Sequence, residues 1–318
     1  MILVTGANGF VGCSLCAVLA HSGQTVVAAT RHTLPDRVVP NITNFQVSTL
    51  AIDTDWQHGL QGCDAVVHLA ARVHVMTDTA ADPLTEFRRV NVDGTLNLAR
   101  QAAAADVRRF IFISSIKVNG ESTCLGQAFT ANDVPGPQDP YSISKHEAEE
   151  GLRKLVAETG MEVVIIRPPL VYGPGVRANF LSMMRWLKWG VPLPLGAIHN
   201  KRSLVALDNL VDLIITCLDH PIAANQTFLA ADGEDLSTTE LLRRMGVALG
   251  SPARLIPVPT SLLEAGAALL GRRDMAQRLC GSLQVDISKA RELLGWNPPI
   301  SVDEALRRTA QGLNEKVV

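Results

Sequence analysis

Thr5-Gly6-Ala7-Asn8-Gly9-Phe10-Val11-Gly12 is the stretch of this chain that decides its fold. It follows the apolar run Ile2–Thr5 and opens a helical pattern that extends to His21. Glycines between a strand and a helix permit a tight turn and a close approach of the backbone to a pyrophosphate, while the helix N-terminus supplies N–H groups. The three glycines therefore predict a dinucleotide-binding turn, although three glycines alone also occur in ordinary turns.

Apolar runs alternate with helical patterns through the first half of the chain, which is typical of βαβ units and a parallel sheet. The runs are almost wholly apolar, as expected when helices cover both faces of the sheet. The expected strands are Ile2–Thr5, Thr25–Ala29, Asn44–Val47, Ala65–Leu69, Phe110–Ser114 and Val163–Arg167, and the expected helices are Val11–His21, Leu84–Ala104 and Ser142–Thr159.

The predicted fold class is α/β, a doubly wound parallel (Rossmann) sheet with a smaller, discontinuous C-terminal lobe. After Pro168 the chain becomes rich in Gly, Pro and Trp, and regular patterns return only near Leu204. We therefore expect residues 1–169 plus about 203–222 to form the dinucleotide-binding domain. Residues 170–202 plus about 223–318 would form the lobe that binds the substrate.

The composition of the chain favours a globular protein that binds small molecules. Its 318 residues are 47% hydrophobic and 19% charged, with a net charge of −2 and a pI near 6.4. Aromatic residues make up only 4%, and no basic stripe is available for a phosphate backbone. Disorder, collagen-like repeats and nucleic-acid binding are therefore not expected.

Location and metal content follow from a few residue types. No run of 18 apolar residues occurs and no basic segment precedes the first strand, so we expect no membrane span and no signal peptide. Six cysteines are too sparse for a disulfide framework, which favours a cytoplasmic protein. The eight histidines form no metal pattern, and His68 is expected to be buried and bonded to the backbone.

A tyrosine and a lysine lie four residues apart at the start of the third helical pattern. Tyr141 and Lys145 share one face of a helix at this spacing, and the fold brings them to the carboxyl edge of the sheet. A free phenol has a pKa of about 10, and a nearby cation stabilises the phenolate. Lys145 and a nicotinamide ring are therefore expected to lower the pKa of Tyr141 by about three units and make it an acid–base group.

A serine pair, Ser114-Ser115, ends the strand before this helix. A hydroxyl at this place can hydrogen-bond the substrate oxygen that changes between carbonyl and alcohol. The alternative is a serine that only bonds its own backbone at the end of a strand.

The choice between NAD and NADP depends on the end of the second strand, where an acidic residue would bind the ribose hydroxyls of NAD. This chain has Thr30-Arg31 there. A guanidinium accepts a 2′-phosphate through charge-assisted bonds, whereas a carboxylate would repel it. NADP(H) is therefore favoured over NAD(H), although Arg31 could also be a solvated loop charge.

These features resemble the extended short-chain dehydrogenase/reductases, in particular their NAD(P)-dependent nucleotide-sugar epimerase/dehydratase group. The resemblance covers almost the whole chain. Besides the stretches already quoted, it is carried by Val67-His68-Leu69-Ala70-Ala71, Asn91-Val92-Asp93-Gly94-Thr95, Arg167-Pro168-Pro169-Leu170-Val171-Tyr172-Gly173-Pro174-Gly175 and Gly295-Trp296.

The resemblance implies catalytic and cofactor-binding roles for individual residues. Ser115 and Tyr141 would contact the substrate, Tyr141 would act as acid and base, and Lys145 would also bond the nicotinamide ribose. The glycine turn and the cofactor cleft would include Gly6, Gly9, Phe10, Val11, Gly12, Ala70, Ala71, Asn91 and Pro168, with Leu50 near the adenine, where the match is poor.

The resemblance also implies contacts with a nucleotide sugar. Asn179 and Arg202 match positions that hold the diphosphate and base of UDP-sugars in relatives. Arg202 could equally pair with Asp208. The arginines at 272, 273 and 278 are further candidates for the diphosphate.

Ser115-Ile116-Lys117 departs from the family's dehydratases, which have Thr-Asp-Glu at this place. A 4,6-dehydratase needs that acid–base pair, so a 4-keto reductase and a UDP-hexose 4-epimerase remain. Arg31 favours NADPH, and the run from Ser114 to Glu121 resembles enzymes of bacterial surface-polysaccharide synthesis. We therefore expect NADPH-dependent reduction of a UDP-4-keto-6-deoxy-hexosamine, with an NAD-dependent UDP-hexose 4-epimerase as the alternative.

An alternative of another class is a non-catalytic NAD(P)-binding sensor, because a fold alone never establishes activity. The presence of Ser115, Tyr141 and Lys145 together argues against it. The resemblance also implies a homodimer, formed through the helices that begin near Leu84 and Ser142.

Overall fold

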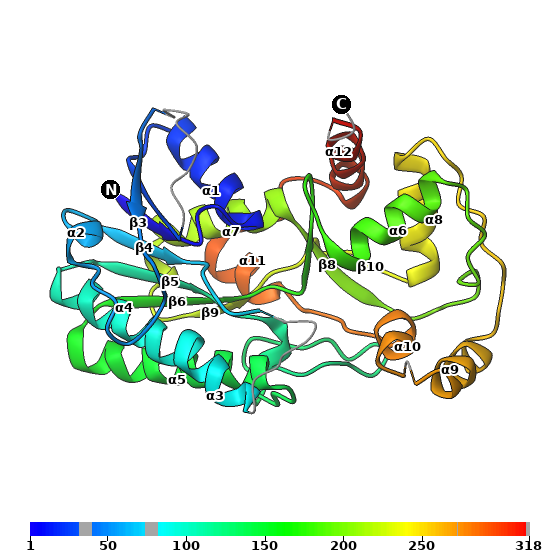
Figure 1. The fold of residues 1–318 in the computed structure, drawn as a ribbon, viewed down its shortest axis with the longest axis horizontal. Coiled ribbons are helices and arrows are strands. Elements are labelled where there is room, and N and C mark those ends of the chain that lie inside the picture. The colour runs from blue at the N-terminus through cyan, green and yellow to red at the C-terminus, as the bar shows by residue number, and fades with distance from the viewer. Residues whose placement is uncertain (32–39, 74–81, 272, 316–318) are drawn as a thin grey trace.

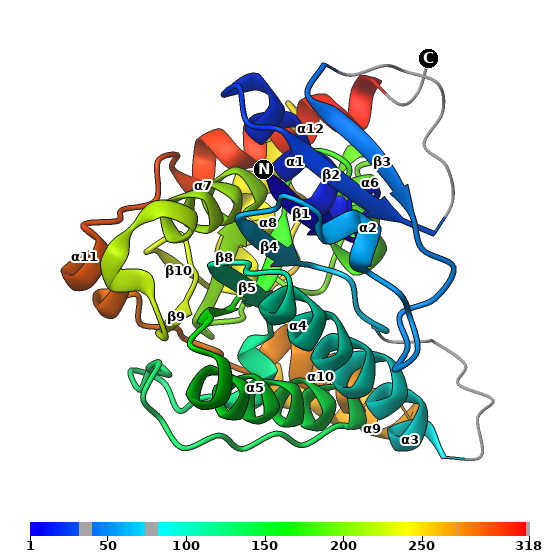
Figure 2. The ribbon, with the colours of Figure 1, turned by 90° about the vertical axis from the view of Figure 1, so that its left-hand side faces the viewer.

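The apolar runs of the chain pair as parallel strands of one large sheet. The computed structural model describes residues 1–31, 40–73, 82–271 and 273–315 (Figures 1 and 2). In this part of the chain the sheet has the order β3-β2-β1-β4-β5-β6-β9, and each pairing is parallel. The bounds are β1 Ile2–Thr5, β2 Val26–Thr30, β3 Ile42–Gln46, β4 Ala65–His68, β5 Arg109–Ile113, β6 Glu162–Arg167 and β9 Thr227–Leu229. The predicted doubly wound α/β fold is confirmed.

The order of the strands reverses at β1. Thr5, its last residue, is in register with Ala29 of β2 on one side and with His68 of β4 on the other. The chain leaves β1 at Gly6, which places the glycine turn at the crevice where such sheets bind their ligand. The segments that follow the other parallel strands reach the same edge.

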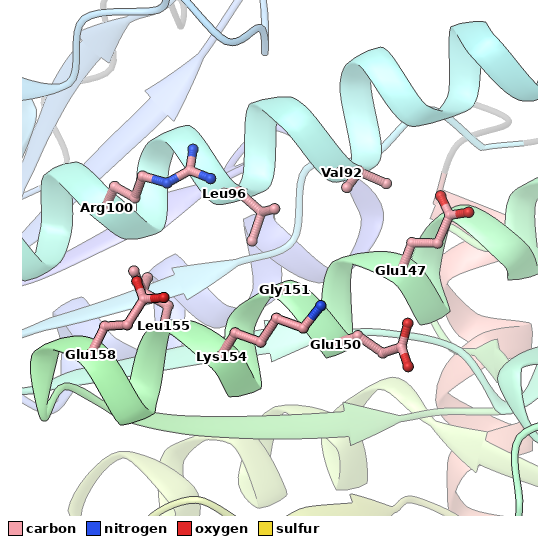
Figure 3. A pocket seen from close by; sticks show the side chains of 9 residues that line it. All are labelled: Val92, Leu96, Arg100, Glu147, Glu150, Gly151, Lys154, Leu155 and Glu158. Carbon is pink, nitrogen blue, oxygen red and sulfur yellow. The ribbon is translucent and has the colours of Figure 1, made fainter.

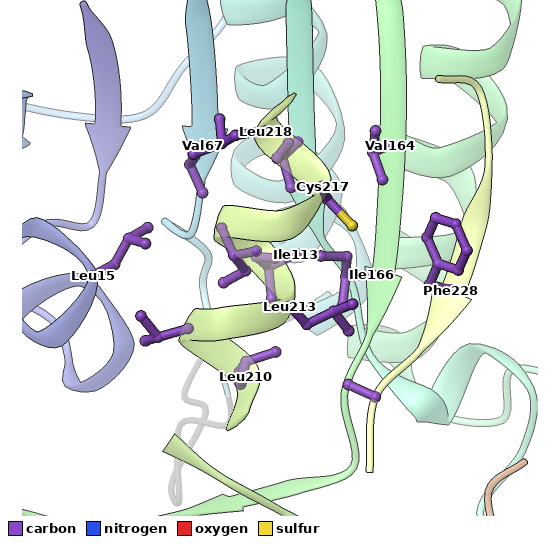
Figure 4. Packing of buried hydrophobic residues seen from close by; sticks show 14 of the residues in the cluster. Leu15, Val67, Ile113, Val164, Ile166, Leu210, Leu213, Cys217, Leu218 and Phe228 are labelled. Atoms are coloured by element: carbon purple, nitrogen blue, oxygen red, sulfur yellow. The ribbon is translucent and has the colours of Figure 1, made fainter. Parts of the chain in front are cut away.

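Helices α1 (Phe10–His21) and α7 (Leu207–Asp219) cover one face of this sheet. Leu210 and Leu213 of α7 are fully buried and lie over Ile113 and Ile166 of the central strands (Figure 4). Full burial of one such side chain contributes about 1.5 to 3 kcal/mol. The short helices η3 (Pro221–Ala223) and α11 (Ser288–Leu294) complete this layer.

The opposite face is covered by α4 (Gly94–Ala104) and α5 (Pro140–Thr159). These two helices run side by side, and Gly151 of α5 faces Leu96 of α4 (Figure 3). A Cβ atom at Gly151 would lie 2.7 Å from the Leu96 methyl carbons, so glycine is what permits this close packing. The helices α2 (Gln57–Leu60) and α3 (Pro83–Arg88) flank the pair.

The helix predicted from Leu84 to Ala104 is divided in the structure. A π-helical turn, η1 (Arg89–Asp93), separates α3 from α4. Buried Asn91 lies in this turn, where its amide group bonds the Arg72 backbone and the hydroxyl of Ser144. Periodicity could not show the division because tertiary hydrogen bonds stabilise this turn.

Local capping determines where α5 begins and ends. Asp139 is the N-cap, and its carboxylate accepts a hydrogen bond from the Ser142 backbone N–H while the Ser142 hydroxyl accepts from the Asp139 N–H. Pro140 occupies the first turn, which suits proline because its missing N–H would be unpaired there. The helix ends at Gly160 in the left-handed conformation. The capping box fixes the first turn, which carries Tyr141.

A smaller lobe follows β6. Its sheet has the order β10-β8-β7, and its core contains Phe180, Leu242 and Leu306. The strands are β7 Leu170–Tyr172, β8 Arg202–Ala206 and β10 Asp235–Leu236, and the helices are α6 Ala178–Lys188, α8 Thr238–Ala248, α9 Thr260–Leu269, α10 Arg273–Cys280 and α12 Val302–Glu315. Figure 1 shows this lobe beyond the carboxyl edge of the large sheet.

The chain passes between the two parts in a way that the sequence does not show. The division expected from composition places β8 mostly in the larger domain and β9 in the smaller lobe, whereas β8 pairs with β7 and β10, and β9 extends the large sheet beside β6. Phe228 of β9 is buried in the core under α7, which explains this placement. Among the described helices, none has the length and apolar character needed to span a bilayer.

His68 is buried, as expected, but its partners are hydroxyl groups rather than the backbone. Its ring nitrogens lie 2.7 Å from Thr5 Oγ1 and 3.0 Å from Thr95 Oγ1. Burial, aided by the charge of Lys145, lowers the pKa of His68 to about 3.

The neutral His68 predicts a pH-dependent stability. The unfolded chain binds this proton near pH 6.5 and the folded chain only near pH 3, so the free energy of unfolding should fall as pH drops through that window, by up to about 1.4 kcal/mol per pH unit. Denaturant titrations between pH 6.5 and 4.5 should show this slope, and His68→Gln should lose it. His58→Gln, at an exposed site of α2, is the control. An identical slope in His68→Gln would contradict the assignment.

Candidate active site

The glycine turn at the end of β1 is shaped to accept a pyrophosphate. Gly6 has a φ of 65° and its carbonyl accepts the Gly9 N–H at 2.8 Å. A Cβ atom at Gly12 would lie 2.2 Å from the Gly6 oxygen, so only glycine fits there. Gly9 caps α1 without a side-chain bond, which leaves the first backbone N–H groups of α1, beginning with Phe10 and Val11, for an anion. These residues fit a dinucleotide.

The residues that the sequence predicts to contact the adenosine end of the cofactor follow β2 and β3. Thr30 is buried at the end of β2, and Arg31 after it is exposed. Leu50 packs on the first residue of α4, since a Cβ atom at Gly94 would lie 2.8 Å from Leu50 Cγ. These residues line the same edge as the glycine turn, because β2 and β3 run parallel to β1 in the same sheet.

The remaining cofactor candidates follow β4 and β6 or lie in the π-helical turn. Ala70 donates its N–H to Thr5 Oγ1 at 3.2 Å, which holds the Ala70-Ala71 segment beside the glycine turn. Pro168 is buried after β6, and its carbonyl accepts the Ile116 N–H at 3.0 Å. Asn91 connects the π-helical turn with α5 through the Ser144 hydroxyl. The fold thus brings these candidates to the carboxyl edge of the sheet.

The candidate catalytic hydroxyls come from two neighbouring elements. Ser115 follows β5 and caps a short 3₁₀ helix, η2 (Ile116–Val118), and its side chain favours the ionised form of the Tyr141 phenol in the first turn of α5. The Tyr141 ring also contacts Phe87 edge-on, with centroids 6.1 Å apart. Burial and the charge of Asp139 together raise the pKa of Tyr141 to about 12.

Lys145 lies beneath this pair, one helical turn along α5. It is 2% exposed, and its Nζ donates to the Ile113 carbonyl at 2.8 Å and lies 4.3 Å from the centroid of the Phe112 ring. Burial lowers the pKa of Lys145 to about 7, against the opposing charge of Glu149. The ammonium is therefore held at the end of β5 with few groups to stabilise it.

The expected fall in the pKa of Tyr141 is not produced by the protein groups. Burial disfavours both the phenolate of Tyr141 and the ammonium of Lys145, and it is the largest influence on the pKa of each group. The protein thus supplies an aligned serine, tyrosine and lysine, and the additional positive charge required for ionisation has to come with the cofactor.

A buried ion pair that the sequence analysis missed holds this helix in place. Glu149 accepts from Arg167 Nε at 2.8 Å and Nη2 at 2.5 Å, and from the Ser114 hydroxyl at 2.6 Å. Arg167 also donates to Asn119 Oδ1 at 2.8 Å. The only signal in the sequence is an acidic residue one turn after Lys145 on the same helical face.

The predicted substrate contacts lie in the smaller lobe. Asn179 is exposed in the first turn of α6. Arg202, at the start of β8, donates to the Gly281 carbonyl at 3.0 Å, and burial together with the positive charge of Arg278 lowers its pKa. Two neighbouring guanidinium groups can form charge-assisted hydrogen bonds with a diphosphate.

The alternative pairing of Arg202 is wrong. Asp208 accepts instead from Arg308 at 2.8 Å, because α12 passes over the start of α7. Arg272 and the side chain of Arg273 lie outside the described residues.

With this geometry established, the comparisons identify the family. Residues 2–231 match the NAD dependent epimerase/dehydratase family. The chain belongs to this family. It is thus an NAD(P)-dependent enzyme of the nucleotide-sugar epimerase or reductase type, as the resemblance implied.

Three relatives of this epimerase/dehydratase chain are informative. A UDP-glucose 4-epimerase of Vibrio cholerae is 50% identical over 98% of this chain and 94% of its own length. The crystal structure of a UDP-glucose 4-epimerase from Thermotoga maritima with UDP-glucose has a TM-score of 0.79 at 21% identity, covering 100% and 99% of the two chains. A Bacillus cereus UDP-glucuronic acid 4-epimerase in complex with NAD has a TM-score of 0.78 at 21% identity, covering 99% and 98%.

The Vibrio cholerae relative overturns the predicted NADPH-dependent 4-keto reductase and favours the epimerase alternative. The reductase prediction depended on Arg31, and the physical reason for the error is clear. Arg31 bears on how the cofactor is held, whereas an epimerase and a reductase differ in whether the hydride returns to the sugar.

Substitutions within this epimerase/dehydratase site should separate proton transfer from cofactor binding. Tyr141→Phe removes the acid–base hydroxyl and should lower nucleotide-sugar turnover by about 10² to 10⁴-fold, with cofactor affinity little changed. Lys145→Met should lower both the turnover and the affinity for the cofactor. Glu150→Gln, at an exposed position of α5, is the control. Steady-state kinetics with cofactor titrations measure these effects, and full turnover by Tyr141→Phe would disprove its role.

Proposed function

We propose that this chain is an NAD(P)-dependent UDP-hexose 4-epimerase. The observation that supports this most is that Ser115 after β5 and Tyr141 and buried Lys145 of α5 come together at the carboxyl edge of a dinucleotide-binding sheet. The 50% identity to a UDP-glucose 4-epimerase supports the same reaction.

In the proposed reaction the C4 hydroxyl of the sugar lies against Ser115 and Tyr141. Bound oxidised cofactor supplies a hydride acceptor and a positive charge. Tyr141, in its ionised form, would take the proton of the C4 hydroxyl as C4 is oxidised, and the Ser115 hydroxyl would hold the resulting carbonyl oxygen. Once the keto sugar has rotated, C4 would be reduced on its opposite face and Tyr141 would return the proton, so no net redox change would result.

The residues after Ser115 support epimerisation over dehydration. Ile116 is 4% exposed and packs in the core of the large sheet. The ammonium of Lys117 contacts Asp139 and Glu121. Neither side chain can serve as the acid of an elimination step in the way that a carboxylic acid does.

The smaller lobe is the proposed site of the UDP moiety. We assign residues 170–206 and most of 223–318 to this lobe, with β9 and α11 as the exceptions noted above. Arg202 and Arg278 carry charges that suit a diphosphate, and Asn179 faces solvent at the start of α6. Cytoplasmic location and a part in surface-polysaccharide precursor synthesis stay predictions.

Inversion at C4 tests the proposed function directly. The purified protein, incubated with UDP-glucose or UDP-N-acetylglucosamine and no added cofactor, should produce a mixture of C4 epimers without net formation of NAD(P)H. Proton NMR of the sugar and absorbance at 340 nm measure the two quantities. Intact substrates after incubation with NAD and with NADP would refute the proposal.

We propose that Arg31 makes the chain prefer NADP(H), although the Bacillus cereus epimerase was solved with NAD. Thr30 brings no carboxylate to this place, and exposed Arg31 is available to a 2′-phosphate.

Arg31→Ala tests this preference. The substitution should weaken NADPH binding by about 10 to 100-fold, the value of one or two charge-assisted bonds, and leave NADH binding nearly unchanged. Fluorescence titration of both cofactors measures this. Equal losses for the two cofactors, or tighter binding of NADH by the unsubstituted chain, would contradict the preference.

The predicted homodimer has a suitable surface. A groove of about 430 Å³ lies between α4 and α5 (Figure 3). Val92, Leu96 and Leu155 supply its apolar lining, and it is flanked by charges of both signs, among them Arg100, Lys154, Glu147, Glu150 and Glu158. A mixed surface of this kind is complementary to its own copy about a twofold axis. We propose that two chains associate here as a four-helix bundle.

Sedimentation tests the proposed dimer. The chain should sediment as a dimer, and Val92→Arg should shift it to a monomer by placing two charges in the apolar part of the contact. Val247→Arg, at an 80% exposed site of α8, should remain dimeric. A monomeric unsubstituted chain would disprove this proposal.

A further inference from the structure

Lys117 is held between two carboxylates next to the catalytic residues. It lies in η2, two positions after Ser115, and its backbone N–H donates to Ser115 Oγ at 3.3 Å. Its Nζ lies 2.5 Å from Asp139 Oδ2 and 3.0 Å from Glu121 Oε1. The three side chains are only 20% to 32% exposed, so water screens these charges incompletely.

Asp139 is the negative charge closest in sequence to Tyr141. It caps α5 two residues before Tyr141, and its two oxygens have different partners, since Oδ1 accepts from the Ser142 N–H at 2.7 Å and Oδ2 accepts from Lys117. Burial acts to raise the pKa of Asp139, but the bonds from Lys117 and Ser142 bring it below the usual value. Asp139 is therefore ionised near neutral pH, and its charge disfavours a phenolate at Tyr141.

Of the described groups near Tyr141, those considered next leave the Asp139 charge uncancelled. Lys145 lies one turn along α5 and donates to the Ile113 carbonyl, and Ser115 is neutral. On α3, the uncharged ring of Phe87 contacts Tyr141, and the guanidinium of Arg72 lies 5.5 Å from that ring's centroid. The charged residues that flank Phe87 have partners of opposite sign, Glu86 with Arg89 and Arg88 with Glu147.

We propose that Lys117 is a positioning residue that neutralises the Asp139 carboxylate, so that Tyr141 can give up its proton during the reaction. This inference rests on the proposed function for its catalytic meaning. Asp139 then keeps its capping role, and its paired charge opposes the ionisation of Tyr141 less than an unpaired carboxylate would.

The hydrogen bonds of Asp139 distinguish an effect of Lys117 on Tyr141 ionisation from an effect on the stability of the fold. The cap uses Asp139 Oδ1, so removing Lys117 leaves the start of α5 hydrogen-bonded. A partly exposed ion pair contributes only about 0 to 1 kcal/mol to stability. Loss of Lys117 should therefore change the ionisation of Tyr141 more than the stability of the fold.

Nuclear magnetic resonance can follow Tyr141 without any substrate. The chain has two tyrosines, and the second, Tyr172, is fully buried and donates to Asp232 at 2.8 Å, which raises its pKa far above the usual range. In protein labelled at the tyrosine ring carbon that bears the hydroxyl and loaded with NAD, only the Tyr141 resonance should titrate. Tyr172→Phe assigns the two resonances.

Four variants form the test. Lys117→Met should raise the midpoint of the Tyr141 titration by about half a unit to one unit, as an uncompensated charge at this range would. Asp139→Asn, which keeps the cap oxygen, should lower it. The double variant should return close to the unsubstituted value, and Lys117→Arg should keep it. Arg307→Met, which removes a charge from α12 in the other lobe, is the control and should not move it.

The acid limb of the pH profile of kcat/KM for epimerisation should move by the same amounts and in the same directions. Unchanged midpoints in Lys117→Met and Asp139→Asn, or shifts of both in one direction, would overturn the inference. If the resonance shifts occur but no sugar is inverted, the proposed function fails while the role of Lys117 in the ionisation of Tyr141 is supported.

Discussion

The burial of the Lys145 ammonium at the end of β5 is the constraint on which the site depends. A cation that is 2% exposed, with the Ile113 carbonyl and the Phe112 ring as its contacts, is poorly stabilised, and its pKa falls to about 7. Loss of solvent likewise disfavours the phenolate of half-buried Tyr141 and raises the pKa of that group. The fold thus favours the uncharged form of both side chains. Their ionisation is therefore sensitive to a charge that a cofactor brings into the site.

This arrangement persists because a buried network fixes the elements around it. Glu149 of α5 holds Arg167 at the end of β6 and Ser114 at the end of β5, and Arg167 reaches Asn119 after η2. Removing one partner of such a pair leaves an uncompensated buried charge, at a cost of about 3 to 5 kcal/mol. The same contacts hold Ser115 in register with α5, so stability and catalytic geometry have a common cause.

Much of this structure was predictable from local sequence patterns, and the rest depends on tertiary contacts. The glycine turn and the apolar strands were predictable because close backbone packing leaves its mark on residue type. The pairing of Glu149 with Arg167, the π-helical turn at Asn91 and the contact of Asp208 with α12 were not, since each joins residues far apart in the chain. The rise in the pKa of Tyr141 that burial causes in the protein alone was not predictable either, because a sequence pattern does not measure burial.

The central claim is that hydrogen leaves C4 of the sugar as a hydride, remains on the enzyme and returns to the same carbon, while Tyr141 exchanges only the hydroxyl proton. UDP-glucose with deuterium at C4, converted by the protein in ordinary water, tests it most directly by mass spectrometry and NMR of both epimers. The account predicts that the deuterium is retained at C4 of the product. Loss of deuterium to the solvent would mean that C4 gives up a proton instead, and would contradict it.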